Sequence, residues 1–410
     1  IKADGNKYGA NLKLREGQGS LHLIASANVK KKNNGDFDMS RLAYQAKIQA
    51  RNIQARHFLP NQDLYSFTGS VQASGVGTDF LSPGTRLNAK AQVNSVHYGK
   101  YKLGNVLAVA HMENGRVHAD IDSKNHFLTG LLSLDALTNT HKIQATVKAD
   151  VRQTDLYQLQ LTKTPMKASL CGYMDVSTDL KDNYNLQASV GDITLRTADK
   201  VYRPVDVLMD VFTRRDTTHA IVDCGDFHLN MNAHGGYKYL LSRIDGLQKE
   251  LLSQMKNRKI DQISLRKNFP MGHIYLATGK SNFISRFLEY CGYQFKSVEM
   301  DLNASPVAGL NGYVNVDSLV AQGIQLDTIR ALVHTEGDTI KYVARVQNNK
   351  SNPQYTFRAL LDGELQERGS NIHAQLFDAK DKLGVDVGLA ALMQEDGIKV
   401  SLIDTHPILG

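Results

Sequence analysis

A long internal repeat constrains the fold of this 410-residue chain more than any other feature. The stretch from Leu87 to Ile121 recurs, at a constant offset of 223 residues, from Leu310 to Ala344. Each copy opens with an alternating run, LNAKAQV or LNGYVNV, and a looser third copy starts at Leu186. Repetition on the order of 50 residues, in a chain that alternates with period two, predicts a stacked β architecture. The positions identical in the first two copies are Leu87/Leu310, Asn88/Asn311, Val93/Val316, Ser95/Ser318, Leu103/Leu326, Ala108/Ala331, His111/His334 and Glu113/Glu336.

Strict alternation of apolar and polar residues predicts strands with one apolar face and one polar face that contacts water. In the run from Ile143 to Arg152 the odd-numbered residues are apolar and the even-numbered residues are polar. A sheet with a single apolar face requires this pattern. We expect hairpin turns at Glu113-Asn114-Gly115, Glu336-Gly337-Asp338 and Glu395-Asp396-Gly397, and a strand break at His57-Phe58-Leu59-Pro60.

A helical segment interrupts the strands. Between Tyr237 and Lys259, apolar residues recur at intervals of three and four, which predicts a helix that opens after Gly235-Gly236. We consider three roles for it: packing on the sheet, which a leucine stripe favours, capping the sheet's apolar face, or lying on a membrane surface. A second short helix is predicted from an N-cap at Ser281 to a stop at Gly292. The stripe of the first helix is Leu240, Ile244, Leu247, Leu251 and Met255.

The apolar faces are rich in Ala, Val, Leu and Ile and poor in large aromatic residues, which usually fill a closed core. We therefore predict a mainly β chain whose elongated, curled antiparallel or mixed sheet forms an open apolar groove, a β-taco, interrupted by a short helical segment. The expected organisation is a first repeat array at 1–235, the helical interruption at 236–295 and a second array at 296–410. The competing interpretation is the closed core of ordinary sandwiches. The predicted groove-lining residues are Ala46, Ile48, Ala108, Ala110, Ile143, Ala145, Val147, Ala149, Ile329, Ala331, Val333 and Tyr342.

Charge and cysteine content exclude several classes of function. The net charge of +7 comes from residues 1–56, which carry eleven Lys or Arg against four acidic residues. A locally basic end suits anionic head groups or a partner surface, but a solvated loop at Lys30 to Lys32 is the preferred explanation. The absence of Trp argues against a nucleic-acid platform. Three distant cysteines, Cys171, Cys224 and Cys291, cannot form a disulfide framework.

The chain has no apolar run of about 18 residues and no signal peptide. It begins with Ile rather than Met, so we expect it to be a piece of a longer protein, with targeting signals outside it.

Catalytic and metal-binding motifs are weak. The chain contains no nucleophile elbow, HExxH or Walker loop, and Gly75-Val76-Gly77 lacks the rest of a dinucleotide fingerprint. On one strand, Cys224, Asp226 and His228 would share a face that zinc could use, with Asp223 and His234 nearby. A second ligand pair is missing, so polar residues on a wet face are the preferred explanation. We expect neither an enzyme nor a metal site nor a cofactor, and a glycan hydrolase is a distant alternative because no facing pair of carboxylates is recognisable.

The tandem short strands with Ala/Val/Leu-lined faces, the repeat unit itself and the helical break between two arrays resemble the TamB / AsmA-like translocation and assembly module family of bacterial envelope proteins. The Asn/Lys/Tyr-rich composition is similar to that of members from Bacteroidota. The resemblance implies a β-taco groove, a periplasmic location, an inner-membrane anchor N-terminal to this segment and an Omp85-type outer-membrane barrel as partner. The family role it implies is transport of phospholipid between the two membranes, with the acyl chains in the groove, or assistance in the assembly of outer-membrane β-barrel proteins.

Overall fold

The computed structural model describes residues 2–57, 63–257, 261–394, 397–403 and 408–409. It divides into two compact units, residues 1–206 (unit 1) and 207–410 (unit 2). The two units are groups of residues that contact each other. The predicted boundaries at 235/236 and 295/296 divide the chain by repeat array instead, and the division into repeat arrays stays a prediction.

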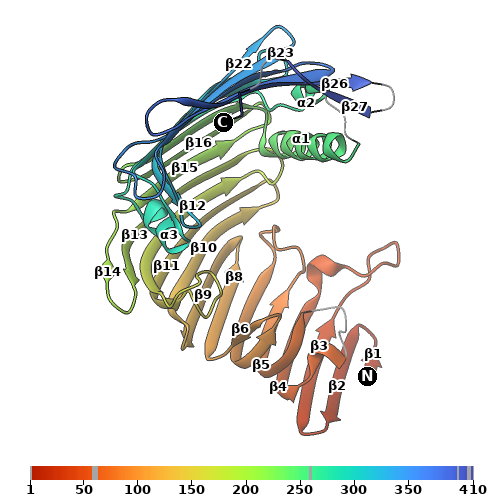
Figure 1. Cartoon of the computed structure of the whole chain (residues 1–410). Helices are drawn as coiled ribbons and strands as arrows, with labels where there is room; N and C mark the ends of the chain where they lie inside the picture. The colour runs from red at the N-terminus through yellow and green to blue at the C-terminus, as the bar shows by residue number, and fades with distance from the viewer. Residues whose placement is uncertain (1, 58–62, 258–260, 395–396, 404–407, 410) are drawn as a thin grey trace. The chain divides into compact units, whose positions relative to one another are not determined.

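Unit 1 consists of strands that follow one another through short turns and pair antiparallel with their chain neighbours (Figure 1). Two 3₁₀ turns, Met39–Arg41 and Ala55–His57, flank β4. The strands are β1 Lys2–Asp4, β2 Lys7–Glu16, β3 Gly19–Asn28, β4 Ala43–Ile53, β5 Leu64–Val76, β6 Arg86–Tyr98, β7 Tyr101–Leu103, β8 Val106–Glu113, β9 Arg116–Asn125, β10 Leu128–Asn139, β11 Lys142–Asp155, β12 Lys167–Thr178, β13 Tyr184–Arg196 and β14 Val201–Tyr202.

Unit 2 has the same antiparallel order and also contains the helices. No helix among the described residues is both long enough and apolar enough to cross a membrane. The elements are β15 Val207–Thr213, β16 Thr217–Cys224, β17 Phe227–His234, α1 Tyr237–Asn257, α2 Gln262–Lys267, β18 Gly272–Thr278, α3 Phe283–Tyr290, β19 Tyr293–Gln294, β20 Ser297–Ser305, β21 Gly309–Ala321, β22 Ile324–Glu336, β23 Thr339–Asn348, β24 Phe357–Leu365, β25 Gly369–Phe377, β26 Leu383–Gln394, β27 Gly397–Leu402 and β28 Ile408–Leu409.

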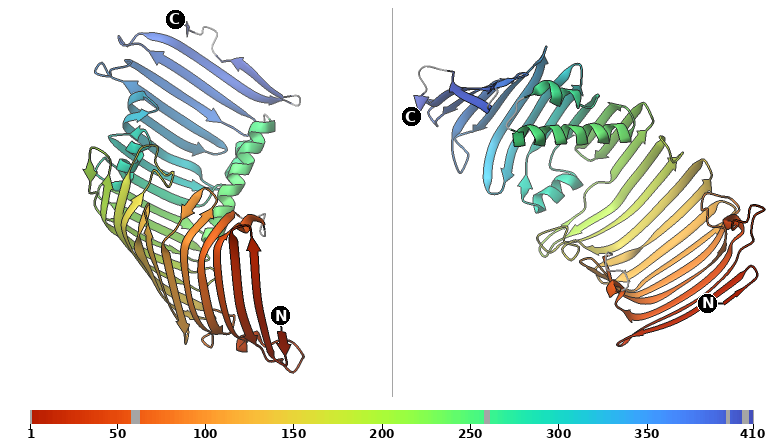
Figure 2. Two further views of the ribbon diagram at one scale, coloured as in Figure 1. Left: turned by 90° about the horizontal axis from the view of Figure 1, so that it is seen from below. Right: turned by 90° about the vertical axis from the view of Figure 1, so that its right-hand side faces the viewer.

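The prediction of a mainly β chain with a curled sheet and a short helical interruption is confirmed. The strand pairing is antiparallel, and among the described residues the sheet is not closed into a barrel. Within each unit the strands lie side by side in a single curved layer (Figure 2). Register shifts at β-bulges bend the strands, as between Ala50 and Ile53 of β4. There Asn52 has a φ of 48°, which asparagine tolerates, and its N–H donates to the Thr68 hydroxyl at 2.8 Å.

The two copies of the repeat fold alike. At the 223-residue offset, β6 corresponds to β21 and β9 corresponds to β23, with the same first and last positions. Each copy ends its last strand on a buried asparagine. The side-chain amide of Asn125 donates to the Gly104 carbonyl, which lies between β7 and β8, and that of Asn348 donates to the Gln325 carbonyl of β22. The predicted Asn114-Gly115 turn is confirmed, because both residues have positive φ. In the equivalent turn of the second copy, Glu336-Gly337-Asp338, only Gly337 has positive φ. Glu395-Asp396 of the third predicted turn and Phe58-Leu59-Pro60 of the predicted strand break lie outside the described residues.

Both predicted helices exist, with local corrections. α1 starts directly after Gly236, and the Tyr237 N–H donates to the Thr213 hydroxyl at 2.9 Å. α3 is capped by Asn282 and not by the predicted Ser281, because the Asn282 side chain accepts the Ser285 N–H at 2.7 Å. Gly292, with a φ of 92°, follows the end of α3 as predicted.

Candidate functional site

A continuous apolar face crosses unit 1 from strand to strand. Side chains directly opposite each other in neighbouring strands form rows, because the register is uninterrupted along these positions. One row contains seven successive alanines, then three larger apolar residues and a last alanine: Ala10, Ala25, Ala46, Ala73, Ala89, Ala110, Ala119, Leu134, Val147, Met174 and Ala188. The adjacent row is Leu12, Leu23, Ile48, Val71, Ala91, Ala108, Ile121, Leu132, Ala149, Gly172 and Val190.

Unit 2 carries an apolar face of the same construction. Of the predicted lining residues, Ala331 lies in one long row, and Val333 and Tyr342 lie opposite each other in the adjacent row. Ile329 lies opposite Val346 on the same face. The eight predicted residues of unit 1 likewise share the apolar face of that unit, Ile143 and Ala145 continuing the alternation of β11. The row in unit 2 is Met209, Val222, Leu229, Leu276, Met300, Val314, Ala331, Ala344, Leu361, Ala374 and Val387.

These faces are not the interior of a closed core. All twelve predicted lining residues are half-buried, and within the same rows Leu12, Ile121 and Leu132 are 47%, 40% and 39% exposed. The chain exposes 25221 Å². A compact monomer of 45.4 kDa exposes about 16,000 Å², and two separate compact units of half that mass expose about 19,000 Å² together. The excess surface is what a single sheet layer produces, so the sandwich interpretation is wrong for the described residues.

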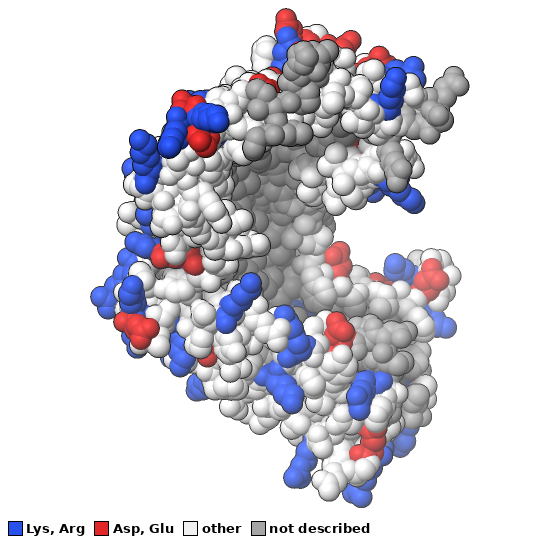
Figure 3. Space-filling model, viewed as in Figure 1, with Lys and Arg blue, Asp and Glu red and all other residues white. Residues whose placement is uncertain are grey.

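The opposite face of each sheet is mainly polar, with some exposed apolar side chains such as Leu332 and Val343 among the polar ones. Lys148 lies beside Val147 in sequence and points to the other side of β11, and His111 and His334 are exposed on this face as predicted. Side chains of both charges are interspersed over the surface seen in Figure 3.

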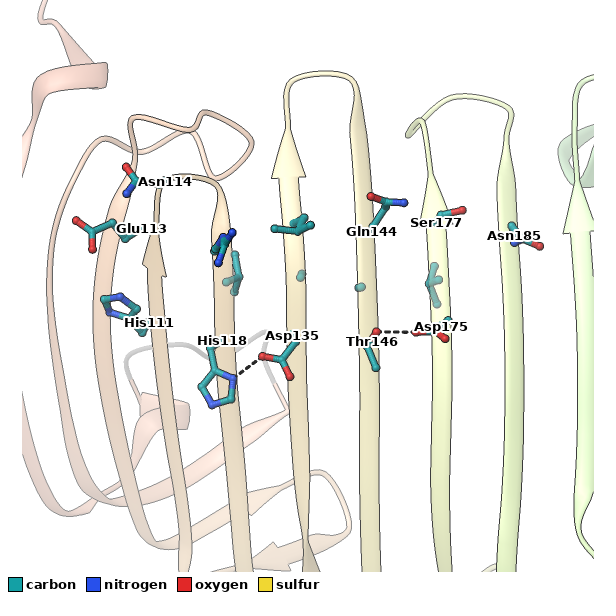
Figure 4. A pocket seen from close by; sticks show the side chains of 16 residues that line it. His111, Glu113, Asn114, His118, Asp135, Gln144, Thr146, Asp175, Ser177 and Asn185 are labelled. Atoms are coloured by element: carbon teal, nitrogen blue, oxygen red, sulfur yellow. Dashed lines mark hydrogen bonds and ion pairs between the residues drawn. The ribbon is translucent and has the colours of Figure 1, made fainter.

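A hollow of about 1190 Å³ lies on the polar face of unit 1, near the hairpin ends of β8 to β13 (Figure 4). His111, His118, Asp135, Thr146 and Asp175 project into it from successive strands. The hydroxyl of Thr146 donates to Asp175 at 2.6 Å. The hollow was not predicted, because alternation places these polar residues on one face but does not give the register that brings the side chains of neighbouring strands together.

His118 contacts two carboxylates in and beside this hollow. Its Nδ1 lies 2.7 Å from an Asp135 carboxylate oxygen and its Nε2 lies 3.1 Å from Asp120. The hydrogen bond with Asp135, followed by the one with Asp120, raises the pKa of His118. The pKa of Asp120 is lowered, chiefly by the hydrogen bond that it accepts from the Ser133 hydroxyl at 2.6 Å. The serine is therefore bonded to the aspartate and not to the histidine, so the trio lacks the order of a nucleophilic triad.

The His118→Gln substitution is expected to reduce the pH dependence of stability. Because the pKa of His118 is raised in the folded state, its contribution is fully present below the ordinary histidine pKa of about 6.5 and is lost as the pH rises through the folded value. The urea midpoint of the unsubstituted protein, followed by circular dichroism, should therefore fall more between about pH 6 and pH 8 than that of the variant. The matched control is His111→Gln, since His111 bonds the neutral Asn88. Equal slopes for the unsubstituted protein and His118→Gln would contradict the expectation.

The predicted sharing of one strand face by Cys224, Asp226 and His228 is wrong. β16 ends at Cys224, Asp226 lies in the turn, and His228 lies on β17, where it bonds Asp223 at 2.7 Å. Asp226 instead accepts hydrogen bonds from the Ser281 N–H and the Asn282 side chain, which fixes the start of α3. No group of three or more His, Cys, Asp or Glu among the described residues is arranged to hold a metal ion.

Only part of the predicted apolar stripe of α1 is buried. Leu240 is buried, but Ile244, Leu251 and Met255 are 53%, 49% and 69% exposed. Polar contacts with residues at the two ends of α2 hold the helix in place.

In comparisons with known proteins, no protein-family model, no curated protein and no solved structure matches this chain.

Proposed function

We propose that this protein is a non-enzymatic carrier of phospholipid, whose acyl chains lie on the apolar faces of the two sheets while the head groups remain in water. The observation that carries the proposal is the unbroken apolar rows, which cross eleven strands in each unit with their side chains only half-buried. Exposed apolar surface costs about 25 cal/mol per Å², so an open face of this extent favours an apolar occupant.

Acyl chains suit this surface because it is long, uniform and without polar interruption along a row. Each methylene that leaves water contributes up to about 0.8 kcal/mol. Successive alanines from Ala10 to Ala119 offer nearly identical positions. An acyl chain that moves from one strand to the next therefore loses and gains similar contacts. Movement along the row then needs no covalent chemistry.

The resemblance to the TamB / AsmA-like family supplies the cellular setting of the proposal. On that basis the protein acts in the periplasm, anchored in the inner membrane by a segment outside this sequence, and works with an Omp85-type barrel protein of the outer membrane. It would carry phospholipid between the inner and outer membranes.

The test is photo-crosslinking in cells at Val147 and Lys148, one position at a time, followed by mass analysis of the adducts. These neighbours lie on opposite faces of β11, so they form a matched pair. We expect phospholipid adducts at Val147 and none at Lys148, because only the first faces the apolar rows. Protein adducts alone at Val147, or the same lipid yield at both positions, would refute lipid carriage.

The second candidate function, a scaffold for the assembly of outer-membrane β-barrel proteins, rests on the open edge of unit 1. β1 pairs only with Lys7 to Gly9 of β2, so in the described chain the outer edge of β2 from Ala10 to Glu16 has no strand partner. Such an edge can pair with an incoming strand. A photo-crosslinker at Asn11 that captures unfolded barrel proteins, with no lipid at Val147, would favour the scaffold.

A further inference from the structure

The outward face of α1 is mostly apolar, with the exposed Gln248 within it. Five of its side chains, called the α1 stripe below, are each about half or more exposed. They fall on one side of the helix, because residues three, four, seven and eleven apart lie close together around a helix axis. A helix that packs on a sheet normally buries such a stripe. The α1 stripe is Leu241 at 60%, Ile244 at 53%, Leu251 at 49%, Leu252 at 55% and Met255 at 69% exposed.

Polar contacts hold α1 in this orientation. Gln254 is 6% exposed; its side-chain amide donates to the Asp261 carbonyl at 2.8 Å, and its oxygen accepts the Asp261 N–H at 3.0 Å. The Arg243 guanidinium donates to the Lys267 carbonyl at 2.6 Å. Together with buried Leu240, these contacts attach one side of α1 to unit 2, and the stripe is left facing outward as a consequence of the fold.

A column of lysines borders the stripe. Lys238, Lys249 and Lys256 are 11 and 7 residues apart, which at about 100° per residue aligns them to within roughly 20°. They lie about 60° around the helix from Leu241, and Asp245 lies between the stripe and the lysines, about 40° from Leu241. Lys249 also contacts Asp245 at 2.6 Å, and its side chain is 74% exposed. An apolar stripe beside a lysine column matches the boundary between acyl chains and anionic head groups, since lysine stems lie along apolar surface while their charged ends stay in water.

We propose that α1 binds the surface of an anionic phospholipid bilayer, with its stripe in the acyl boundary and its lysine column among the head groups. This surface is separate from the sheet faces. It attaches unit 2 to a membrane whether or not the sheets hold lipid, so it goes beyond the proposed carriage of lipid.

The experiment uses the absence of tryptophan from the chain. Variants Leu251→Trp and Met255→Trp each place a single indole in the stripe, and Ser253→Trp places one at an exposed position outside it. On addition of vesicles of phosphatidylcholine and phosphatidylglycerol at 70:30, we expect the emission of the two stripe variants to shift to the blue, because an indole that enters the acyl boundary leaves water. The Ser253→Trp variant should not shift.

The charge component has its own control. Replacing Lys238, Lys249 and Lys256 together by Gln in the Leu251→Trp background should weaken vesicle binding at least tenfold, since each basic residue near an anionic surface contributes on the order of a fivefold gain. The proposal fails if the stripe variants show no blue shift, if Ser253→Trp shifts equally, or if the triple Lys→Gln change has no effect. It also fails if the shift follows protein concentration without vesicles, because the stripe would then contact a second copy of the chain. A Val147→Trp variant reports separately on the sheet, so loss of lipid carriage and loss of membrane binding are distinguishable.

Discussion

The Gly312→Ala variant is expected to lose about 3 kcal/mol or more of the free energy of unfolding of unit 2, because glycine is required at this point of β21. Gly312 has a φ of 144°, and a Cβ built there would lie 1.9 Å from the Asp301 carbonyl oxygen of β20. The clash is with backbone, so relief requires the β20–β21 pair to separate. Urea unfolding followed by circular dichroism, with hydrogen exchange to locate the loss in β20 to β22, measures the effect.

The repeat provides the matched control. The position equivalent to Gly312 in the first copy is Ala89, so comparison of the two copies alone would rate the substitution harmless. The reverse change, Ala89→Gly, should cost only about 0.5–1 kcal/mol, since it adds backbone freedom without strain. A Gly312→Ala protein as stable as Ala89→Gly would mean that β21 does not follow the described backbone path.

A charge on the apolar face is expected to remove most of the bound lipid without unfolding the sheet. Ala110→Glu places a carboxylate in the alanine row between Ala89 and Ala119. A carboxylate without a partner is costly to remove from water, so an acyl chain cannot cover it. Ala110 is half-buried, which leaves the charge access to water in the empty protein. Lipid extracted per mole of purified protein, quantified by mass spectrometry, should fall severalfold.

His111→Glu is the control for this prediction. It introduces the same charge one residue along β8, on the polar face. The lipid content should stay at the level of the unsubstituted protein, and unchanged circular dichroism in both variants separates loss of lipid from loss of fold. Val147 lies in the same row as Ala110, three strand spacings or about 14 Å away, so lipid adducts at Val147 should also decrease in Ala110→Glu. Full lipid content in Ala110→Glu would argue that the apolar face is not the lipid site.

The sequence determines the sheet and its dry face because period-two alternation is local. Ile143, Ala145 and Val147 share a face for the same reason that they alternate with polar residues. The turn at Asn114-Gly115 could also be predicted, since both residues tolerate positive φ. Features that depend on contacts between distant segments could not be predicted from the sequence. The side of α1 that packs depends on Asp261 and Lys267, and the requirement for glycine at position 312 depends on the path of β20.

The candidate site follows the same division. Placement of the lining residues on one face was accessible from alternation, whereas the polar hollow around His118 and Asp135 depends on the register of β9 against β10. The grouping of Cys224, Asp226 and His228 failed because a turn at Gly225-Asp226 interrupts the strand. Gly225 has a positive φ of 63°, so the Cys-Gly-Asp sequence was the available signal for that turn.

The pairing of each strand with its chain neighbours has a consequence for how the protein is made. Every ladder from β2 to β6 joins segments a few tens of residues apart, so the contact order is low for a β protein. During synthesis a new strand can dock on the one before it as soon as its hairpin is complete, without waiting for a distant partner. The edge that grows in this way is always the most recent strand, and the nascent chain therefore exposes only one unpaired β edge at its growing end at any time.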